Sequence, residues 1–346
     1  MTAGRLGRIA AATMTSLTLL ALAVSPVGTV QASGASRADE SDNPWLHRRF
    51  LHIAHQGGES EAPSNTMYAY RRAVAIGADM LELDVHSTAD DVLVASHDAT
   101  VDRTTNGTGL IRNMTYRQVR RLDAAYNFVP GQSAVPGLPP ESYPLRGIRT
   151  HDRRPPRGYR ASDFAIPSLH QVLTTFRRLP ISIEIKGTSD ADTESFLHNA
   201  RLLAKLLKQT RRTGNVIVTS FNDAAVAEFH RLAPGVALAP GRVGLTNYFF
   251  AGVPPVEGTA ALQVPVQFQG IPVATADFIA RAHADGYAVH VWFSGTAPED
   301  EPTYNALIDA CADGLMTSWP TLLERILDQR GIARPGSPGI DPCTTD

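Results

Sequence analysis

Hydrophobic and polar positions alternate along the chain in blocks that predict strands and helices in turn. Short apolar runs rich in β-branched residues and bounded by turn residues predict strands. The predicted strands are 50–54, 80–85, 92–96, 181–185, 216–220, 236–239, 289–293 and 314–317. Longer segments with apolar residues three and four positions apart predict helices. The predicted helices are 65–76, 168–178, 192–212, 223–232, 275–284, 304–312 and 320–329.

Eight strands joined mostly by helices predict a parallel sheet of the α/β class. At this length a (β/α)₈ barrel, the TIM-barrel architecture, is the natural closure, and we expect it over residues 46–332. The alternation also fits a doubly wound open sheet. The link from His86 to Asp91 is too short for a helical crossover, so the second and third strands depart from the simple pattern.

Three segments depart from this rhythm. Residues 100–165 are rich in Pro, Gly and Arg and too long for an ordinary loop, so we expect an insertion after the third strand, over one mouth of the barrel. Residues 240–269 form a smaller segment that we expect to be irregular. Residues 333–346 are rich in Pro and Gly and predict a flexible tail.

The N-terminus has the pattern of a secretory leader. Arg5 and Arg8 precede an uncharged, mainly apolar stretch, and Val30-Gln31-Ala32 before Ser33 fits a signal-peptidase site. We expect a signal peptide over residues 1–32, a flexible mature N-terminus over 33–45 and a secreted protein. The apolar stretch is too short and too rich in Thr and Ser for a typical membrane span, so we expect none in the mature chain. A retained membrane anchor is the alternative.

Charge and cysteine content narrow the function only a little. The formal net charge is −2, so no overall field attracts nucleic acid, and we expect no nucleic-acid partner. The two cysteines, Cys311 and Cys343, carry no metal-site or redox motif. In an oxidising compartment they could form a disulfide. One buried thiol and one thiol in the tail is an equal alternative.

Carboxylates at the ends of two predicted strands point to a metal site. The two-residue period of a strand puts Glu82 and Asp84 on one face of the second strand. It likewise puts Glu184 and Lys186 on one face of the fourth. Neighbouring carboxylates in a barrel interior repel and are costly to desolvate, and a hard divalent cation such as Mg²⁺ or Ca²⁺ removes that cost. A salt bridge, for example Glu82 with Lys186, is the alternative.

Two histidines occupy similar strand-end positions. His55 ends the first predicted strand and His97 ends the third, and such positions face the barrel mouth where these folds place their active sites. A pair of histidines there can act as acid and base near neutral pH. We leave His86 out of the site, because a residue at the strand's end can point to solvent. We expect His52, on the opposite strand face, to be structural.

A series of short motifs surrounds these residues. In order they are His55-Gln56-Gly57, Pro63-Ser64-Asn65-Thr66, residues 77–85, Ser96-His97-Asp98, residues 102–107, Glu184-Ile185-Lys186, Ser220-Phe221, Trp292 and residues 313–317. The series resembles the glycerophosphodiester phosphodiesterase family, whose pattern is HRG, PENT, GAD-x-x-E-x-D, HD and DRTT. The resemblance covers about residues 50 to 330, nearly the whole expected mature chain.

The resemblance implies a role for each matching residue. It implies metal ligands at Glu82, Asp84 and Glu184, an acid–base pair at His55 and His97, and substrate contacts at Gln56, Lys186 and Trp292. It further implies a metal-dependent enzyme, using Ca²⁺ or Mg²⁺, that hydrolyses small-molecule or lipid-derived phosphodiesters to an alcohol and glycerol 3-phosphate. Attack by a hydroxyl of the substrate's own glycerol and direct attack by water both remain open.

Two departures from the family pattern lie next to His55. Gln56 replaces the family's Arg, which removes a fixed positive charge and its two-pronged grip on phosphate. Ser64 stands where the family has Glu. Glu59 and Glu61 are near enough in sequence to compensate, although exposed loop glutamates are the simpler reading. These changes bear on substrate identity more than on activity.

Three other functions remain as alternatives. A phospholipase D-like enzyme acting on lysolipids or sphingolipids would need an apolar mouth, which Phe128, Val129 and Tyr143 of the insertion could supply. A glycoside hydrolase could use Glu82 and Glu184 as its carboxylate pair, but that leaves the histidines unexplained. A catalytically inert barrel that binds polymers such as teichoic acid is the third.

Overall fold

The computed structural model describes residues 43–293, 295 and 297–344. The predicted signal peptide, residues 1–32, and most of the predicted N-terminal segment 33–45 lie outside the described residues. Within the described part of the chain, no helix is both long and apolar enough to cross a membrane.

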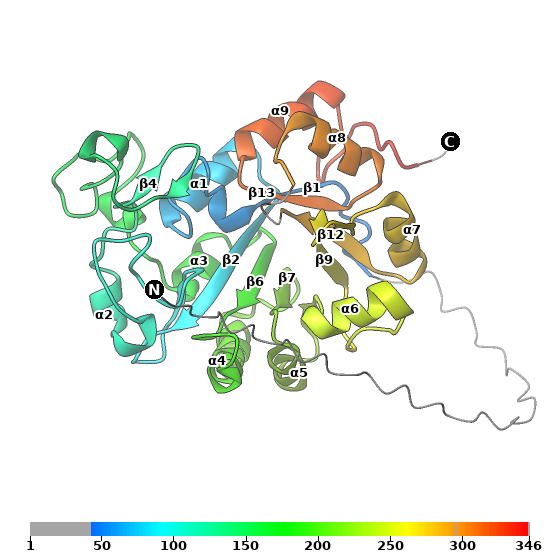
Figure 1. Ribbon diagram of the computed structural model, residues 1–346, viewed down its shortest axis with the longest axis horizontal. Helices are drawn as coiled ribbons and strands as arrows, with labels where there is room; N and C mark the ends of the chain where they lie inside the picture. The colour runs from blue at the N-terminus through cyan, green and yellow to red at the C-terminus, as the bar shows by residue number, and fades with distance from the viewer. Residues whose placement is uncertain (1–42, 294, 296, 345–346) are drawn as a thin grey trace, which may run out of the picture. The chain divides into compact units, whose positions relative to one another are not determined.

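Eight parallel strands form a nearly closed barrel in the described part of the chain, which confirms the predicted fold class (Figure 1). They are β1 (Leu51–Ala54), β2 (Met80–Ser87), β6 (Ile181–Ile185), β7 (Val216–Thr219), β8 (Ala237–Leu238), β9 (Ala261–Pro265), β12 (Ala288–Trp292) and β13 (Gly314–Thr317). Each strand pairs with its neighbours in chain order except at β8 and β9, which form the two edges, and β1 pairs with β13. Between β8 and β9 a single bridge from Leu238 to Thr259 draws the last two edges together.

Helices cover the outside of the barrel (Figure 1). They are α1 (Met67–Ile76), α3 (Leu169–Thr175), α4 (Thr193–Thr210), α5 (Asp223–Leu232), α6 (Arg242–Ala251), α7 (Ala276–Ala284), α8 (Glu301–Asp309) and α9 (Pro320–Arg330). Polar side chains cap several helix starts: Asp192, Asn222 and Thr275 each accept a hydrogen bond from the backbone N–H three residues on. The apolar helix faces then pack on the outward side chains of the strands.

The third predicted strand is not a barrel strand. β3 (Leu93–Ala95) pairs antiparallel with the end of β2, with Val85 opposite Ala95. The short link after His86 allows only this hairpin geometry, because a parallel neighbour would need a long crossover. The prediction of a barrel strand over 92–96 is therefore wrong.

The missing barrel strand comes from residues 240–269, which we predicted to be irregular. This segment contains α6 and β9. Helix α6 has no side-chain cap and buries only Tyr248, so its sequence lacks the usual helical signals. In strand β9 the run of apolar residues is interrupted by Gln263. The Gln263 side chain points into the barrel and donates a hydrogen bond to Ser182 Oγ at 2.9 Å. A polar residue inside the barrel hid the strand from the apolar pattern.

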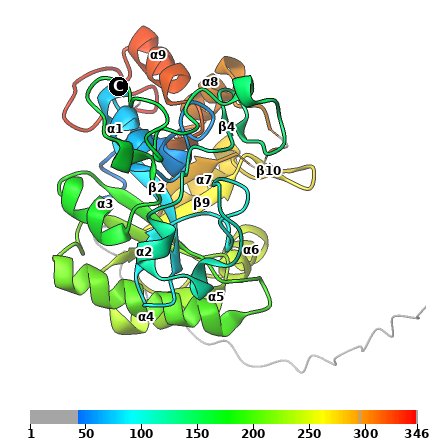
Figure 2. The same cartoon turned by 90° about the vertical axis from the view of Figure 1, so that its left-hand side faces the viewer.

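The insertion 100–165 lies beside β2 and α3 (Figure 2). It contains α2 (Tyr116–Val119), the small hairpin of β4 (Phe128–Val129) and β5 (Ser133–Ala134), and short 3₁₀ turns at Ile111–Asn113, Pro140–Ser142 and Ala161–Phe164. It touches the barrel mouth where the Gly131 N–H donates to the Ser60 carbonyl. A second small hairpin, β10 (Gln267–Phe268) with β11 (Ile271–Pro272), follows β9.

The C-terminal segment, which we predicted to be a flexible tail after residue 332, is held against the domain over its described residues. Cys343 forms a disulfide with Cys311, so the open question about the cysteines is resolved in favour of a bond. Arg334 lies 2.6 Å from Glu324 Oε2, and Ile332 bridges to Ile340. These contacts link residues that are far apart in sequence, which the Pro/Gly content alone cannot reveal.

A neutral histidine lies inside the barrel, away from its mouth. His290 of β12 is fully buried, with the Trp45 ring edge-on at 6.3 Å. Neither of its ring nitrogens has a hydrogen-bond partner among the described residues. Burial lowers the pKa of His290 to about 4, and the negative charge of Asp313 offsets this only in part.

This burial predicts an acid-sensitive contribution to stability. Between pH 6.5 and pH 4, His290 is protonated in the unfolded chain but stays neutral in the folded one. The unfolded state is therefore favoured by acid, and the free energy of unfolding falls as pH drops from about 6.5 towards 4. We expect His290→Gln to make the loss of unfolding free energy between pH 7.5 and pH 5 smaller by about 2 kcal/mol. Urea unfolding at both pH values measures this, with exposed His170→Gln as the control. An unchanged loss would contradict the prediction.

Candidate active site

Three carboxylates meet at the mouth of the barrel. Glu82 and Asp84 lie on β2 and Glu184 lies on β6, where Asp84 and Glu184 are direct neighbours across the two strands. One oxygen from each of the three lies within 4.8 Å of the others. The prediction that Glu82 and Asp84 share one face of β2 is thus confirmed. The parallel register of β2 and β6 places Glu184 beside that face.

A half-buried lysine partly neutralises these carboxylates. Lys186 Nζ lies 2.7 Å from Glu184 Oε1 and 3.2 Å from Asp84 Oδ1. Burial together with the charge of Asp84 raises the pKa of Glu82 to about 8. One ammonium group therefore does not balance three buried carboxylates.

The donor set fits a hard divalent cation. Glu184 Oε1 is buried and, although Lys186 Nζ is close to it, accepts no well-directed hydrogen bond from any described residue. Carboxylate oxygens are the ligands that Ca²⁺ and Mg²⁺ prefer, and Ca²⁺ binds them at about 2.3–2.6 Å. Oxygens as close together as these can reach one such ion. A cation would also remove the repulsion that raises the pKa of Glu82.

His55 lies between two carboxylates. Its Nδ1 lies 3.0 Å from Glu59 Oε1 and its Nε2 lies 3.8 Å from Glu82 Oε2. Burial by itself would lower the pKa of His55, but Glu82 and Glu59 outweigh it and raise the pKa to about 10. Ser133 of the insertion donates to the other oxygen of Glu59 at 3.2 Å. Glu59 is thus a partner of His55 and not the exposed loop residue that we considered.

His97 has a different partner. It follows β3, and its Nδ1 lies 2.8 Å from Asp98 Oδ1. Arg103 donates to both oxygens of Asp98, at 2.7 and 3.2 Å, and so holds that carboxylate in place. The hydrogen bond that His97 donates to the Asp98 carboxylate raises the pKa of His97. His97 lines the cavity, and because Nδ1 is occupied, Nε2 is the ring nitrogen left available for chemistry.

Gln56 contacts the carboxylate cluster through its backbone. It adopts a positive φ of 50°, and its backbone N–H donates to Glu82 Oε2 at 3.0 Å. Its side chain is buried outside the cavity wall. The other predicted site residues all line one cavity: His55, Glu82, Asp84, His97, Glu184, Lys186 and Trp292. The substrate contact proposed for Gln56 stays a prediction, whereas its backbone clearly orients Glu82.

Two further residues hold Asp84 in place, Asn65 directly and Tyr70 through Asn65, and we did not predict either role from the sequence. Asn65 Nδ2 donates to Asp84 Oδ2 at 3.2 Å, and the Tyr70 hydroxyl donates to Asn65 Oδ1 at 2.7 Å. Both side chains are buried. Asn65 belongs to the Pro63–Thr66 motif, so that motif carried the signal, but only the folded chain shows the contact with Asp84.

The two histidines left out of the site lie outside the cavity. His52 is buried with Nδ1 2.9 Å from Glu324 Oε2, a structural contact as predicted. His86 does not point to solvent: it is buried, and its Nε2 lies 3.2 Å from the His97 carbonyl oxygen.

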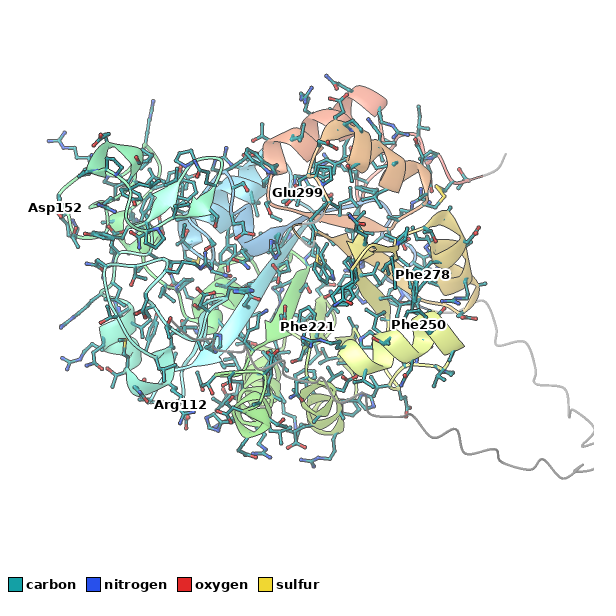
Figure 3. All side chains as sticks on the ribbon, viewed as in Figure 1. Arg112, Asp152, Phe221, Phe250, Phe278 and Glu299 are labelled. Carbon is teal, nitrogen blue, oxygen red and sulfur yellow. A yellow bond between two sulfur atoms is a disulfide. The ribbon has the colours of Figure 1, made fainter. Side chains whose placement is uncertain are left out.

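The cavity has a volume of about 490 Å³ and a second, apolar side. Its apolar wall consists of Phe221, Leu245, Phe249, Phe250, Pro265, Phe268, Ile271, Val273, Trp292, Phe293 and Met316. Figure 3 shows Phe221 at the end of β7 and Phe250 on α6. None of the described residues 100–165 lines this cavity. Phe128, Val129 and Tyr143, which we considered for an apolar mouth, are buried within the insertion. The apolar mouth that the phospholipase D-like alternative would need is present, but α6, the β10–β11 hairpin and the ends of the barrel strands supply it instead of the insertion.

Comparison with known proteins agrees with this geometry. The model of the glycerophosphoryl diester phosphodiesterase family matches residues 55–321. The chain belongs to this family. It is 27% identical over 81% of its length to a glycerophosphodiester phosphodiesterase of Caldanaerobacter subterraneus, 99% of which is covered. It is 29% identical to one of Bacillus subtilis, over 67% of this chain and 70% of that protein.

Solved structures share the fold. A phosphodiesterase from Oleispira antarctica, solved in complex with the product sn-glycerol-3-phosphate, matches with a TM-score of 0.60 and 20% identity over 81% of this chain and 97% of that one. A phosphodiesterase structure from Silicibacter pomeroyi matches with a TM-score of 0.62 and 20% identity over 84% and 98% of the two chains. The chain is therefore a phosphoric diester hydrolase by family, with the barrel of its relatives.

The contact between Glu59 and His55 predicts an electrostatic role for Glu59. Glu59→Gln keeps a hydrogen-bond acceptor beside Nδ1 but removes a negative charge, so the pKa of His55 should fall. We expect kcat/KM for glycerophosphocholine to drop about tenfold or more, with the alkaline limb of its pH profile moved to lower pH.

Glu61→Gln is the matched control, because Glu61 contacts Arg72 and Thr321 instead of His55. Its pH profile should stay in place. A wild-type profile in Glu59→Gln would show that His55 does not depend on Glu59.

Proposed function

We propose that this protein is a metal-dependent enzyme that hydrolyses glycerophosphodiesters to an alcohol and glycerol 3-phosphate. The observation that carries the proposal is the convergence of three carboxylates, two histidines and a lysine on one cavity. Family membership supports the same reaction. A glycoside hydrolase would leave both histidines and Lys186 without a role.

The binding part of the mechanism follows from the charges. Glu82, Asp84 and Glu184 would hold a divalent cation, Ca²⁺ or Mg²⁺, which supplies positive charge for the non-bridging phosphate oxygens. Lys186 adds a second positive charge beside Asp84 and Glu184. Gln56 lacks the charge of the family's Arg, so the phosphate depends more strongly on Lys186.

The two histidines would carry the protons. His55 is held protonated between Glu59 and Glu82 and is suited to donate a proton to the leaving alkoxide. His97 has its Nδ1 fixed by Asp98, which leaves Nε2 to remove a proton from the attacking hydroxyl or water. The same residues serve attack by the substrate's own glycerol hydroxyl or by water.

We further propose that the protein is exported. The basic, apolar and small-residue regions of the first 32 residues have the pattern of a signal peptide. The disulfide between Cys311 and Cys343 supports an oxidising destination, since such bonds are rare in the cytosol.

The activity is tested by choline release from glycerophosphocholine. We expect turnover to vanish in EDTA and to return with Ca²⁺ or Mg²⁺. His97→Ala should lower kcat by about 100- to 10,000-fold, because a positioned acid or base contributes that much. Exposed His170→Ala is the control. Full turnover after dialysis against EDTA, or in His97→Ala, would contradict the mechanism.

Export is tested by expressing the full chain in a bacterial host and sequencing the N-terminus of the recovered protein. Cleavage after Ala32 predicts a first residue of Ser33, in protein released from the cytoplasm. Recovery only from the cytoplasm, or with Met1 intact, would contradict this proposal.

A further inference from the structure

The apolar wall of the cavity continues onto the protein surface. Phe250 is 69% exposed, Phe268 53%, Ile271 44% and Phe221 42%, and all four line the cavity. Val243 in the first turn of α6 and Val253 just after its end are also exposed, but neither lines the cavity. Of the nine exposed large hydrophobic side chains among the described residues, four therefore gather at this one rim. An apolar patch of this kind marks a place where apolar material binds.

The wall is built from residues that already pack on one another. The rings of Phe221 and Trp292 meet edge to face with centroids 6.0 Å apart. On α6, Leu245 and Phe249 are four residues apart and so share the face that lines the cavity. The Phe249 ring contacts Phe278 of α7 with centroids 5.5 Å apart, which anchors this face. The apolar wall is thus formed before any ligand arrives.

The wall begins directly beside the charged cluster. Phe221 has the Lys186 ammonium 5.7 Å and the Arg242 guanidinium 5.3 Å from its ring centroid. A phosphate held at Lys186 and the carboxylate-bound cation would therefore carry its next substituent onto the apolar wall. A small polar alcohol gains nothing from the exposed aromatic side chains at the outer end of that wall.

We propose that the preferred substrate is a lysophospholipid, a glycerophosphodiester that bears one long hydrocarbon chain, and that the chain lies along the wall from Phe221 to Phe250 and Phe268. This inference rests on the proposed phosphodiesterase activity and names its substrate class. A single chain leaves one glycerol hydroxyl free, so either route of attack remains available.

The lysophospholipid would be hydrolysed by the same steps that we propose for glycerophosphodiesters. The oxygen of the attacking hydroxyl or water forms a new bond to phosphorus and gives up its proton to His97. The bond from phosphorus to the headgroup oxygen breaks, and that oxygen takes a proton from His55. Where the glycerol hydroxyl attacks, water then opens the cyclic phosphate. The products are the headgroup alcohol and a lysophosphatidate.

The test compares choline release from palmitoyl lysophosphatidylcholine, below its micelle concentration, with choline release from glycerophosphocholine. Both substrates share a headgroup, so one assay reads both. We expect a higher kcat/KM for the lysolipid in the wild type. Phe250→Ser and Phe268→Ser should each lower the lysolipid-to-glycerophosphocholine ratio about tenfold or more, because each removes one buried aromatic contact with the chain. Val74→Ser, an exposed apolar residue of α1 outside the cavity, is the control and should leave the ratio unchanged.

The outcomes separate the two proposals. Turnover of glycerophosphocholine without turnover of the lysolipid, or a ratio unchanged in both Phe variants, overturns this inference and leaves the proposed function standing. Lysolipid turnover only above the micelle concentration also overturns it, in favour of docking to a lipid surface. Turnover of neither diester with Ca²⁺ or Mg²⁺ present overturns the proposed function and this inference with it.

Discussion

Three carboxylates lie together at the mouth of the barrel, and their mutual repulsion determines which charged and hydrogen-bonding groups must surround them. Glu82, Asp84 and Glu184 have oxygens within 4.8 Å of one another in a buried setting. Like charges at that distance in a low-dielectric environment are tolerated only with positive charge nearby. Lys186 supplies part of it, and the surplus negative charge suits this end of the barrel to a cation.

The surroundings of the cluster work to hold each carboxylate in place. The Gln56 backbone donates to Glu82, and Asn65 donates to Asp84 while being fixed by Tyr70. The histidines in turn have carboxylate partners of their own, Glu59 for His55 and Asp98 for His97. Each partner fixes one ring nitrogen and leaves the other for chemistry. The carboxylates suited to a cation and the histidines suited to proton transfer are thus separate groups, and each is held by its own hydrogen-bond partner.

One cavity joins this polar machinery to an apolar wall, and the two sides have different structural origins. The polar side comes from the strand ends of β2 and β6 and the loops after β1 and β3, which carry the family motifs. The apolar side comes in part from α6 and the hairpin after β9, and in part from residues at the ends of β7, β12 and β13, among them Phe221 and Trp292.

The sequence by itself determined the barrel class, most of the helices and the charged residues that meet in one cavity. It could do so because the relevant signals are local: a two-residue period sets the faces of β2 and β6, and short motifs mark the strand ends. The tertiary structure alone decided that β3 turns back on β2, that β9 completes the barrel, and that Cys311 bonds Cys343. It also decided that Glu59 contacts His55 and that α6 forms part of the apolar wall. These features depend on contacts between distant segments, or on polar and apolar side chains placed against the usual pattern, so no local window of the sequence contains them.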